Sequence, residues 1–87
     1  MKLGICDSCL DVFKIIQENV RSCRCGKSSA TLKEDKRTVQ VNGPIKVIGI
    51  DDATLFEAMK KQPVKGLGKE FKSFVLPKFN KSVIVIK

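Results

Sequence analysis

The sequence predicts an α+β fold, in which a cysteine-rich N-terminal hairpin is joined to a small antiparallel β-sheet with one short helix. Three observations lead to this prediction. All four cysteines fall within the first 25 residues, and the remaining chain carries several short apolar segments bounded by turn residues. Only residues 52–61 combine capping signals with an apolar helical face. With 87 residues, the chain makes a single domain, 1–87, small enough to gain from a stabilising metal.

The cysteines form two close pairs, Cys6 and Cys9 in a C-x₂-C spacing, and Cys23 and Cys25 in a C-x-C spacing. Two thiol pairs on short loops suit a tetrahedral zinc ion, and Gly26 follows the second pair where such a turn often needs a positive φ. Disulfides, free thiols or an iron–sulfur site are the alternatives. Since four cysteine ligands leave no open position on the metal, the expected role of this zinc is structural.

The segment between the two pairs, residues 10–22, fits either a helix or a strand–turn–strand. A hairpin with its turn at residues 17–19 brings the pairs together directly, so we expect residues 1–27 to form one zinc-binding module. The body, residues 28–87, should then begin with strands near 30–32 and 38–41.

The next segments follow from turn and capping residues. Residues 42–44, Asn-Gly-Pro, predict a turn, and residues 45–50 predict a strand. The helix should be capped by Asp52, or by Thr54 with Glu57 three residues later, and Pro63 should end it. Its apolar face would consist of Leu55, Ala58 and Met59.

The C-terminal part reads as a loop over residues 62–70, a strand over 71–76 and a turn over 78–81. Residues 82–86 then form a strand that is apolar on both faces. Such a strand is typical of the middle of a sheet, so we expect it there and not at an edge.

The chain is basic, with 17 lysines and arginines against 9 acidic residues and a formal charge of +8. Four thiolates around Zn²⁺ would lower this to about +6. A basic protein favours anionic partners, either nucleic acid, nucleotides or an acidic protein surface, although lysine can also serve solubility alone. No apolar run reaches 18 residues and no apolar leader precedes Cys6, so we expect no membrane segment and a cytoplasmic setting.

The lysines cluster toward the C-terminal end of the chain. Basic groups interleaved with aromatic residues are typical of nucleic-acid-binding surfaces, although phenylalanines in strands more often belong to the core. Because Phe71 and Phe74 would lie on opposite strand faces, we expect at least one of them in the core. The candidate anion-binding residues are Lys60, Lys61, Lys65, Lys69, Lys72 and Lys78, with Lys81, Phe71, Phe74 and Phe79 beside them.

Catalytic signals are weak. The chain has no histidine to act as a general base near neutral pH, and its cysteines are expected to bind metal. Asp51 and Asp52 read as a helix start more readily than as a cation site. The segment Gly66-Leu67-Gly68-Lys69 does not complete a phosphate-loop pattern. We therefore expect a protein that is not an enzyme.

With their flanking residues, the cysteine pairs of residues 3–27 resemble a rubredoxin-like zinc ribbon, although the C-x-C pair is shorter than the usual one. The wider chain is similar to small uncharacterised proteins of tailed bacteriophages and prophages, through Val-Ile-Gly-Ile-Asp at 47–51 and Gly-Lys-Glu-Phe…Phe-Val-Leu-Pro at 68–77. The resemblance implies a zinc site at the four cysteines and a phage or bacterial setting, but no activity.

Together these features predict a non-enzymatic, phage-encoded zinc-ribbon protein that engages an acidic partner, either nucleic acid or a host protein. The alternative is a counter-defence protein that sequesters a small anionic nucleotide signal. In that case Lys65, Gly66, Gly68 and Lys69 would line a site between subunits.

Overall fold

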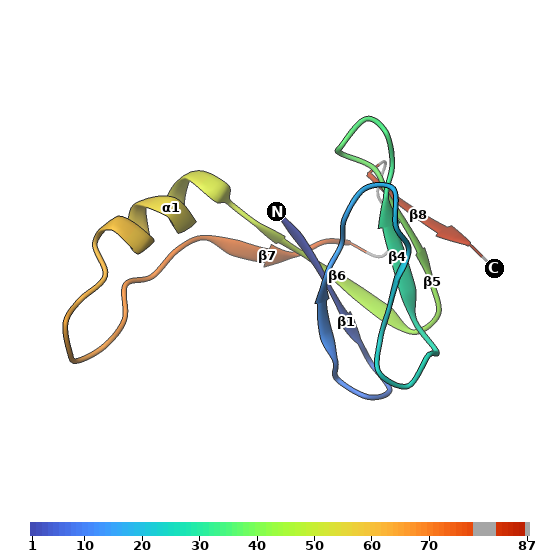
Figure 1. The fold of residues 1–87 in the computed structure, drawn as a ribbon, viewed down its shortest axis with the longest axis horizontal. Helices are drawn as coiled ribbons and strands as arrows, with labels where there is room; N and C mark the ends of the chain where they lie inside the picture. Colours follow the sequence, from blue (N-terminus) through green and yellow to red (C-terminus); the bar gives the residue numbers. More distant parts are fainter. Residues whose placement is uncertain (78–81, 87) are drawn as a thin grey trace.

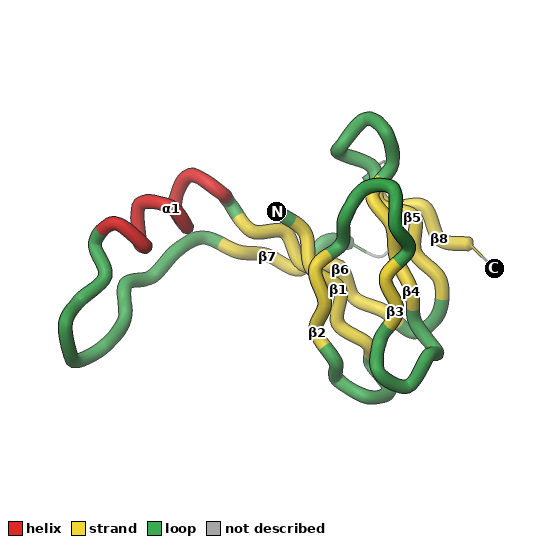
Figure 2. Tube along the Cα trace, viewed as in Figure 1, coloured by secondary structure: helices red, strands yellow, loops and turns green. Residues whose placement is uncertain are grey.

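The computed structural model describes residues 1–77 and 82–86. Its elements, in chain order, are β1 (Lys2–Cys6), β2 (Val12–Lys14), β3 (Arg21–Ser22), β4 (Ser29–Leu32), β5 (Val39–Asn42), β6 (Ile45–Ile50), α1 (Asp52–Lys60), β7 (Ser73–Val75) and β8 (Val83–Ile86). The strands form two four-stranded sheets, ordered β2-β1-β6-β7 and β3-β4-β5-β8 (Figures 1 and 2). This confirms the predicted mostly β fold with one short helix.

The hydrophobic core lies where the two sheets meet. Alternation of small β-branched residues places Val39 and Val41 of β5 inward, and Val47 of β6 meets them from the other sheet. Phe13, Ile45, Leu32 and Leu76 cover this cluster, and its buried members are Ile15, Ala30, Val39, Val41, Val47 and Val83. The core is therefore built from small side chains.

The predicted hairpin between the two cysteine pairs is wrong. Among the described strands, β2 pairs with β1 and β3 pairs with β4, so β2 and β3 enter different sheets. The chain crosses between the sheets over residues 15–20, and Ile15 is buried in the core at the start of this crossing. Consequently each cysteine pair lies at the turn of its own hairpin, β1–β2 or β3–β4.

The last strand also differs from its predicted place. β8 lies at the edge of its sheet and runs parallel to β5, so the sheets are not wholly antiparallel. Since β4 already occupies the other side of β5, β8 has only the edge available. Val83 packs into the core, whereas Ile84 and Val85 are 41% and 40% exposed. The predicted turn over residues 78–81 lies outside the described residues.

Helix α1 and the chain that returns from it to β7 form a projection, residues 52–72, which we call the arm. It extends beyond the end of the β6–β7 pair, away from the two sheets (Figure 1). Within the arm Ala58 is buried, but Phe56 and Met59 are 51% and 62% exposed. Among the described residues, no helix is long and apolar enough to cross a membrane.

The predicted caps of α1 are wrong, because both side chains have other partners. No side chain caps the described helix, whose N-cap is Asp51. The Asp52 carboxylate pairs with the N-terminal amine of Met1 at 2.8 Å. Thr54 Oγ1 accepts a hydrogen bond from the Lys72 amide at 2.9 Å, so it joins the helix to the returning chain.

Candidate metal centre

The four predicted cysteines come together at one end of the two sheets. Cys6 ends β1 and Cys9 follows in the β1–β2 turn, while Cys23 and Cys25 lie in the β3–β4 turn. These two turns lie side by side at the bottom of Figure 1. We call them the first and second cysteine turns.

The two cysteine turns share one backbone pattern. In the first, the Leu10 amide donates to the Cys6 carbonyl at 2.8 Å, and in the second the Gly26 amide donates to the Cys23 carbonyl at 3.1 Å. Leu10 and Gly26 have positive φ angles of 60° and 77°. The predicted left-handed glycine is therefore confirmed, and Leu10 is its counterpart after the first pair. Leu10 and Gly26 each stand one residue after the second cysteine of a pair. The left-handed backbone at Leu10 could therefore have been predicted from the sequence.

The sulfur geometry fits a single tetrahedral ion. All four Sγ atoms lie within 4.8 Å of one another; the Cys6–Cys25 distance is 3.7 Å and the Cys23–Cys25 distance is 3.4 Å. A tetrahedron with Zn–S bonds of about 2.3 Å has S···S edges of about 3.8 Å. The sulfurs are much farther apart than the roughly 2.05 Å of a disulfide, and all four cysteines are free. The cluster is positioned to hold a metal ion, and four thiolates in this geometry suit zinc.

Ser28 supports the cluster from inside the protein, with only 1% of its surface exposed. Its amide donates to Cys23 Sγ at 3.3 Å, and its hydroxyl lies 3.2 Å from Cys6 Sγ. Hydrogen bonds of this kind orient metal ligands and stabilise their charge. Sequence reasoning missed Ser28, because a serine three residues after a cysteine pair carries no distinctive signal.

The thiols have different proton affinities. The Ser28 hydroxyl lowers the pKa of Cys6 to about 6, in spite of its burial and with help from the Cys9 and Ser8 amides. Burial raises the pKa of Cys23, but hydrogen bonds with the Ser28 amide, Cys25 and Cys9 together outweigh it, and the net shift is downward. The Lys27 amide lowers the pKa of Cys25, yet its hydrogen bonds with Cys23, Cys9 and Cys6, together with partial desolvation, raise it more, to about 12. Adjacent thiolates repel, so full deprotonation of the cluster needs a bound cation.

The turn between β5 and β6 supports both cysteine turns. The Pro44 carbonyl accepts a hydrogen bond from the Asp7 amide at 2.7 Å and lies 3.1 Å from the Ser28 hydroxyl. Gly43, at φ 92°, lies against the second turn, where an added Cβ would come within 1.9 Å of the Lys27 carbonyl oxygen. Sequence reasoning predicted a turn at 42–44 but not its contact with the cysteines.

Five of the six predicted anion-binding lysines are exposed on the arm, and Lys78 lies outside the described residues. Lys61, Lys69 and Lys72 line one shallow hollow between α1 and the returning chain. Two acids, Glu57 and Glu70, share this hollow, and Lys61 pairs with Glu57 at 3.0 Å. Lys60 and Lys65 lie outside it, so the structure brings together only part of the predicted set.

The expectation that Phe71 or Phe74 belongs to the core is wrong. The two side chains are 42% and 54% exposed, because the arm and β7 extend away from the junction of the sheets. The ring of Phe74 lies over Gly49 of β6, where an added Cβ would come within 2.6 Å of Cε2. Both aromatic rings are therefore partly open to solvent.

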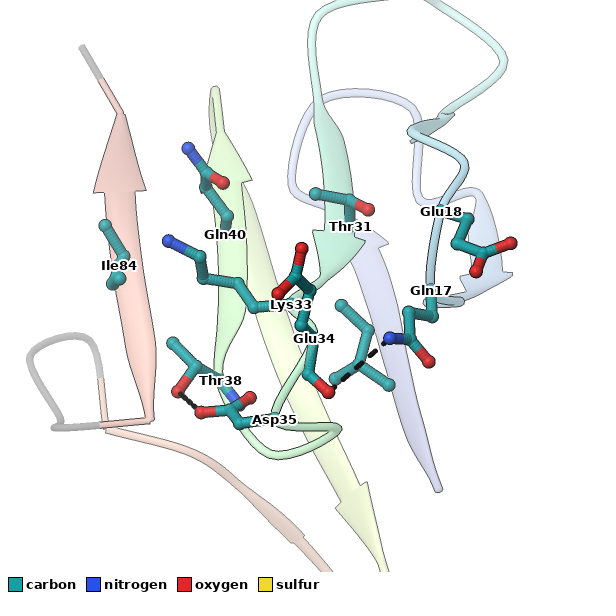
Figure 3. A pocket seen from close by; sticks show the side chains of 10 residues that line it. Gln17, Glu18, Thr31, Lys33, Glu34, Asp35, Thr38, Gln40 and Ile84 are labelled. Atoms are coloured by element: carbon teal, nitrogen blue, oxygen red, sulfur yellow. Dashed lines mark hydrogen bonds between the residues drawn. The ribbon is translucent and has the colours of Figure 1, made fainter.

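A polar hollow lies at the other end of the sheets, between residues 17–18 and the β4–β5 turn (Figure 3). Its Asp35 carboxylate accepts hydrogen bonds from the Arg37 and Thr38 amides at 2.9 and 2.8 Å, and from the Thr38 hydroxyl at 2.6 Å. These bonds, the Thr38 hydroxyl foremost, lower the pKa of Asp35 to about 2. The carboxylate thus holds the turn together.

No family model matches this sequence, and no curated protein or solved structure is significantly similar to it. The resemblance to zinc ribbons therefore rests on the four-cysteine cluster itself, in a small β-rich protein. The expected phage setting stays a prediction.

Proposed function

We propose that this is a non-enzymatic zinc protein that binds nucleic acid through the lysines of its arm. The observation that carries the proposal is the arm itself, where residues 60–72 hold five lysines and a single acid, Glu70. Every residue of this stretch is exposed. A concentration of positive charge, projected away from the two sheets, is suited to contact with phosphates.

The rest of the molecule supports this role. The cysteine cluster stabilises the sheets from which the arm extends, and Zn²⁺ held by four cysteines has no open position for a reacting ligand. Phe71 and Phe74, exposed near the base of the arm, add flat surfaces on which bases could stack. An acidic host protein would use the same lysines, but it would gain less from these aromatic rings.

A salt titration tests the proposal. Labelled single- and double-stranded DNA and RNA of 20 or so nucleotides should bind at low salt, with affinity falling steeply as salt rises. Replacing Lys60, Lys65 and Lys72 with glutamine should weaken binding and reduce the slope of log K against log salt by about three.

The matched control replaces three exposed lysines outside the arm, Lys14, Lys33 and Lys36, with glutamine. This variant has the same net charge as the arm variant, and it should retain most of the affinity. Absence of binding at low salt would refute the proposal, as would equal losses in the two variants. Binding to an acidic host protein alone would point to the other predicted partner.

The nucleotide-signal alternative has no specific support in the structure. An added Cβ at Gly66 or Gly68 would meet no atom within 4 Å, so no other segment packs closely against these two glycines. The alternative stays a prediction about a site between subunits, which a thermal-shift screen with cyclic and linear nucleotides can test.

A further inference from the structure

The tip of the arm carries two aliphatic side chains that touch almost nothing. Val64 and Leu67 are 102% and 95% exposed, the highest values among the large apolar residues of the described chain. They lie in the loop at the far left of Figure 1, the part of the arm most distant from the sheets. Isolated apolar residues on a surface are common, but two fully exposed ones at the end of a projection favour a contact made there.

Lysines alternate with these apolar residues along the loop, in the order Pro63-Val64-Lys65-Gly66-Leu67-Gly68-Lys69. Pro63 restricts the entry to the loop, and Gly66 turns it with φ 92°. The result is a narrow loop with apolar side chains and a positive charge on either side of Leu67. Proteins that bend DNA use this combination, in which an apolar wedge enters between base pairs and basic groups contact the flanking phosphates.

We infer that the nucleic acid bound by the arm is a DNA duplex, and that Val64 and Leu67 insert between adjacent base pairs and bend it. Lys65 and Lys69 then contact the phosphates beside the opened step. This inference rests on the proposed function and adds the form of the nucleic acid and the mode of contact.

Two other occupants fit the tip less well. Single-stranded nucleic acid is bound mainly by stacking on aromatic rings, and the exposed rings Phe71 and Phe74 lie toward the base of the arm and on β7. A membrane surface would need more apolar area, because even one myristoyl chain binds only marginally and two short aliphatic side chains bury less. The charge and small apolar area of the tip suit a groove lined with phosphates.

The test uses a duplex labelled at both ends for energy transfer, with 2-aminopurine near its centre. The intact zinc-loaded protein should shorten the end-to-end distance and raise the 2-aminopurine fluorescence. The double variant Val64→Ser with Leu67→Ser should bind about tenfold more weakly, with an unchanged salt slope and neither signal.

The matched control is Val20→Ser with Val12→Ser, which removes two aliphatic side chains that are 67% and 52% exposed outside the arm. Equal zinc content in both variants shows that each is folded, and the control should bend DNA as the unmodified protein does. The inference would be overturned if the unmodified protein bound the duplex without bending it. It would also be overturned if the Val64→Ser, Leu67→Ser variant still bent the duplex. Preference for single strands or for phosphatidylserine vesicles would also overturn it. Loss of all nucleic-acid binding at low salt would instead refute the proposed function.

Discussion

At the scale of single residues, two glycines near the cysteines differ in why they are needed. Both have positive φ, Gly43 at 92° and Gly26 at 77°. An added Cβ on Gly43 would lie 1.9 Å from the Lys27 carbonyl oxygen, whereas one on Gly26 would meet nothing within 4 Å. The backbone conformation restricts both positions, but only Gly43 is also restricted by another segment of the protein, at Lys27.

This difference predicts unequal costs for the two alanine substitutions. Gly26→Ala should lower the free energy of unfolding by about 1 kcal/mol, the cost of a left-handed non-glycine residue. Gly43→Ala should cost at least about 3 kcal/mol, because the second cysteine turn must also move. Urea denaturation of the zinc-loaded variants measures both values, and equal losses would contradict the packing of the β5–β6 turn against the cysteines.

For Leu10 we predict the opposite effect, a gain in stability on substitution. It occupies the same left-handed position as Gly26, yet it is 72% exposed and so gains little from its side chain. Leu10→Gly should therefore raise the free energy of unfolding by up to about 1 kcal/mol, as relief of the backbone cost outweighs the added flexibility of glycine. Thermal denaturation checks this, and a clear loss of stability would show that the leucine side chain has a structural role.

At the scale of the elements, the β4–β5 turn depends on the charge of Asp35. Its folded-state pKa of about 2 lies below the reference value of 3.8, so the carboxylate stabilises the fold above about pH 4. That contribution disappears as the pH falls toward 2. In the zinc-loaded protein at pH 7, where the carboxylate is ionised, Asp35→Asn should therefore lower the free energy of unfolding.

The neighbouring substitution Glu34→Gln is the control, because it removes an adjacent carboxylate that accepts none of these three hydrogen bonds. Urea denaturation of the zinc-loaded variants at pH 7 gives the comparison. Equal losses for the two substitutions would show that the hydrogen bonds of the turn do not depend on the carboxylate charge.

The elements themselves could largely be predicted from the sequence, but their partners could not. Alternation located β5 and β6, with β6 at its full bounds, and the apolar helical face before Pro63 located α1, although its predicted caps were wrong. β2 pairs with β1, which lies only a few residues before it, and a hairpin between the cysteine pairs was predicted because residues 2–6 were not recognised as a strand. β8, apolar on both faces, was placed in the middle of a sheet although only an edge was available, because a local pattern does not show which neighbouring positions are occupied.

The metal centre shows the same division. Its four ligands could be predicted, because the spacing of the cysteines is a local property. Ser28 and Pro44 could not be predicted, since they reach the cysteines only when β4 and the β5–β6 turn are packed beside them. Exposure of the arm was also missed, because an apolar helical face in sequence does not show whether anything covers it.

At the scale of the whole molecule, stability must come from more than the apolar core. The largest fully buried side chains are Val39, Cys6 and Ser28, so a small core continues directly into the cysteine cluster. The cluster joins a turn from each sheet, and the Asp11 carboxylate adds a hydrogen bond from the Arg24 amide at 2.9 Å. A metal bound here therefore ties the two sheets together at the end where the cysteine turns lie.

Metal removal should consequently unfold the protein. We expect about one zinc per chain by elemental analysis, from the single four-cysteine cluster. Structural zinc binds with about 10–16 kcal/mol in small domains, more than the roughly 5–15 kcal/mol by which most domains are stable. Chelation should abolish cooperative unfolding, and stoichiometric Zn²⁺ should restore it. Cys9→Ser should have the same effect as chelation, whereas the control Ser8→Ala, one residue away, should retain zinc. An unchanged melting transition after complete metal removal would show that the apolar core alone suffices to stabilise the fold.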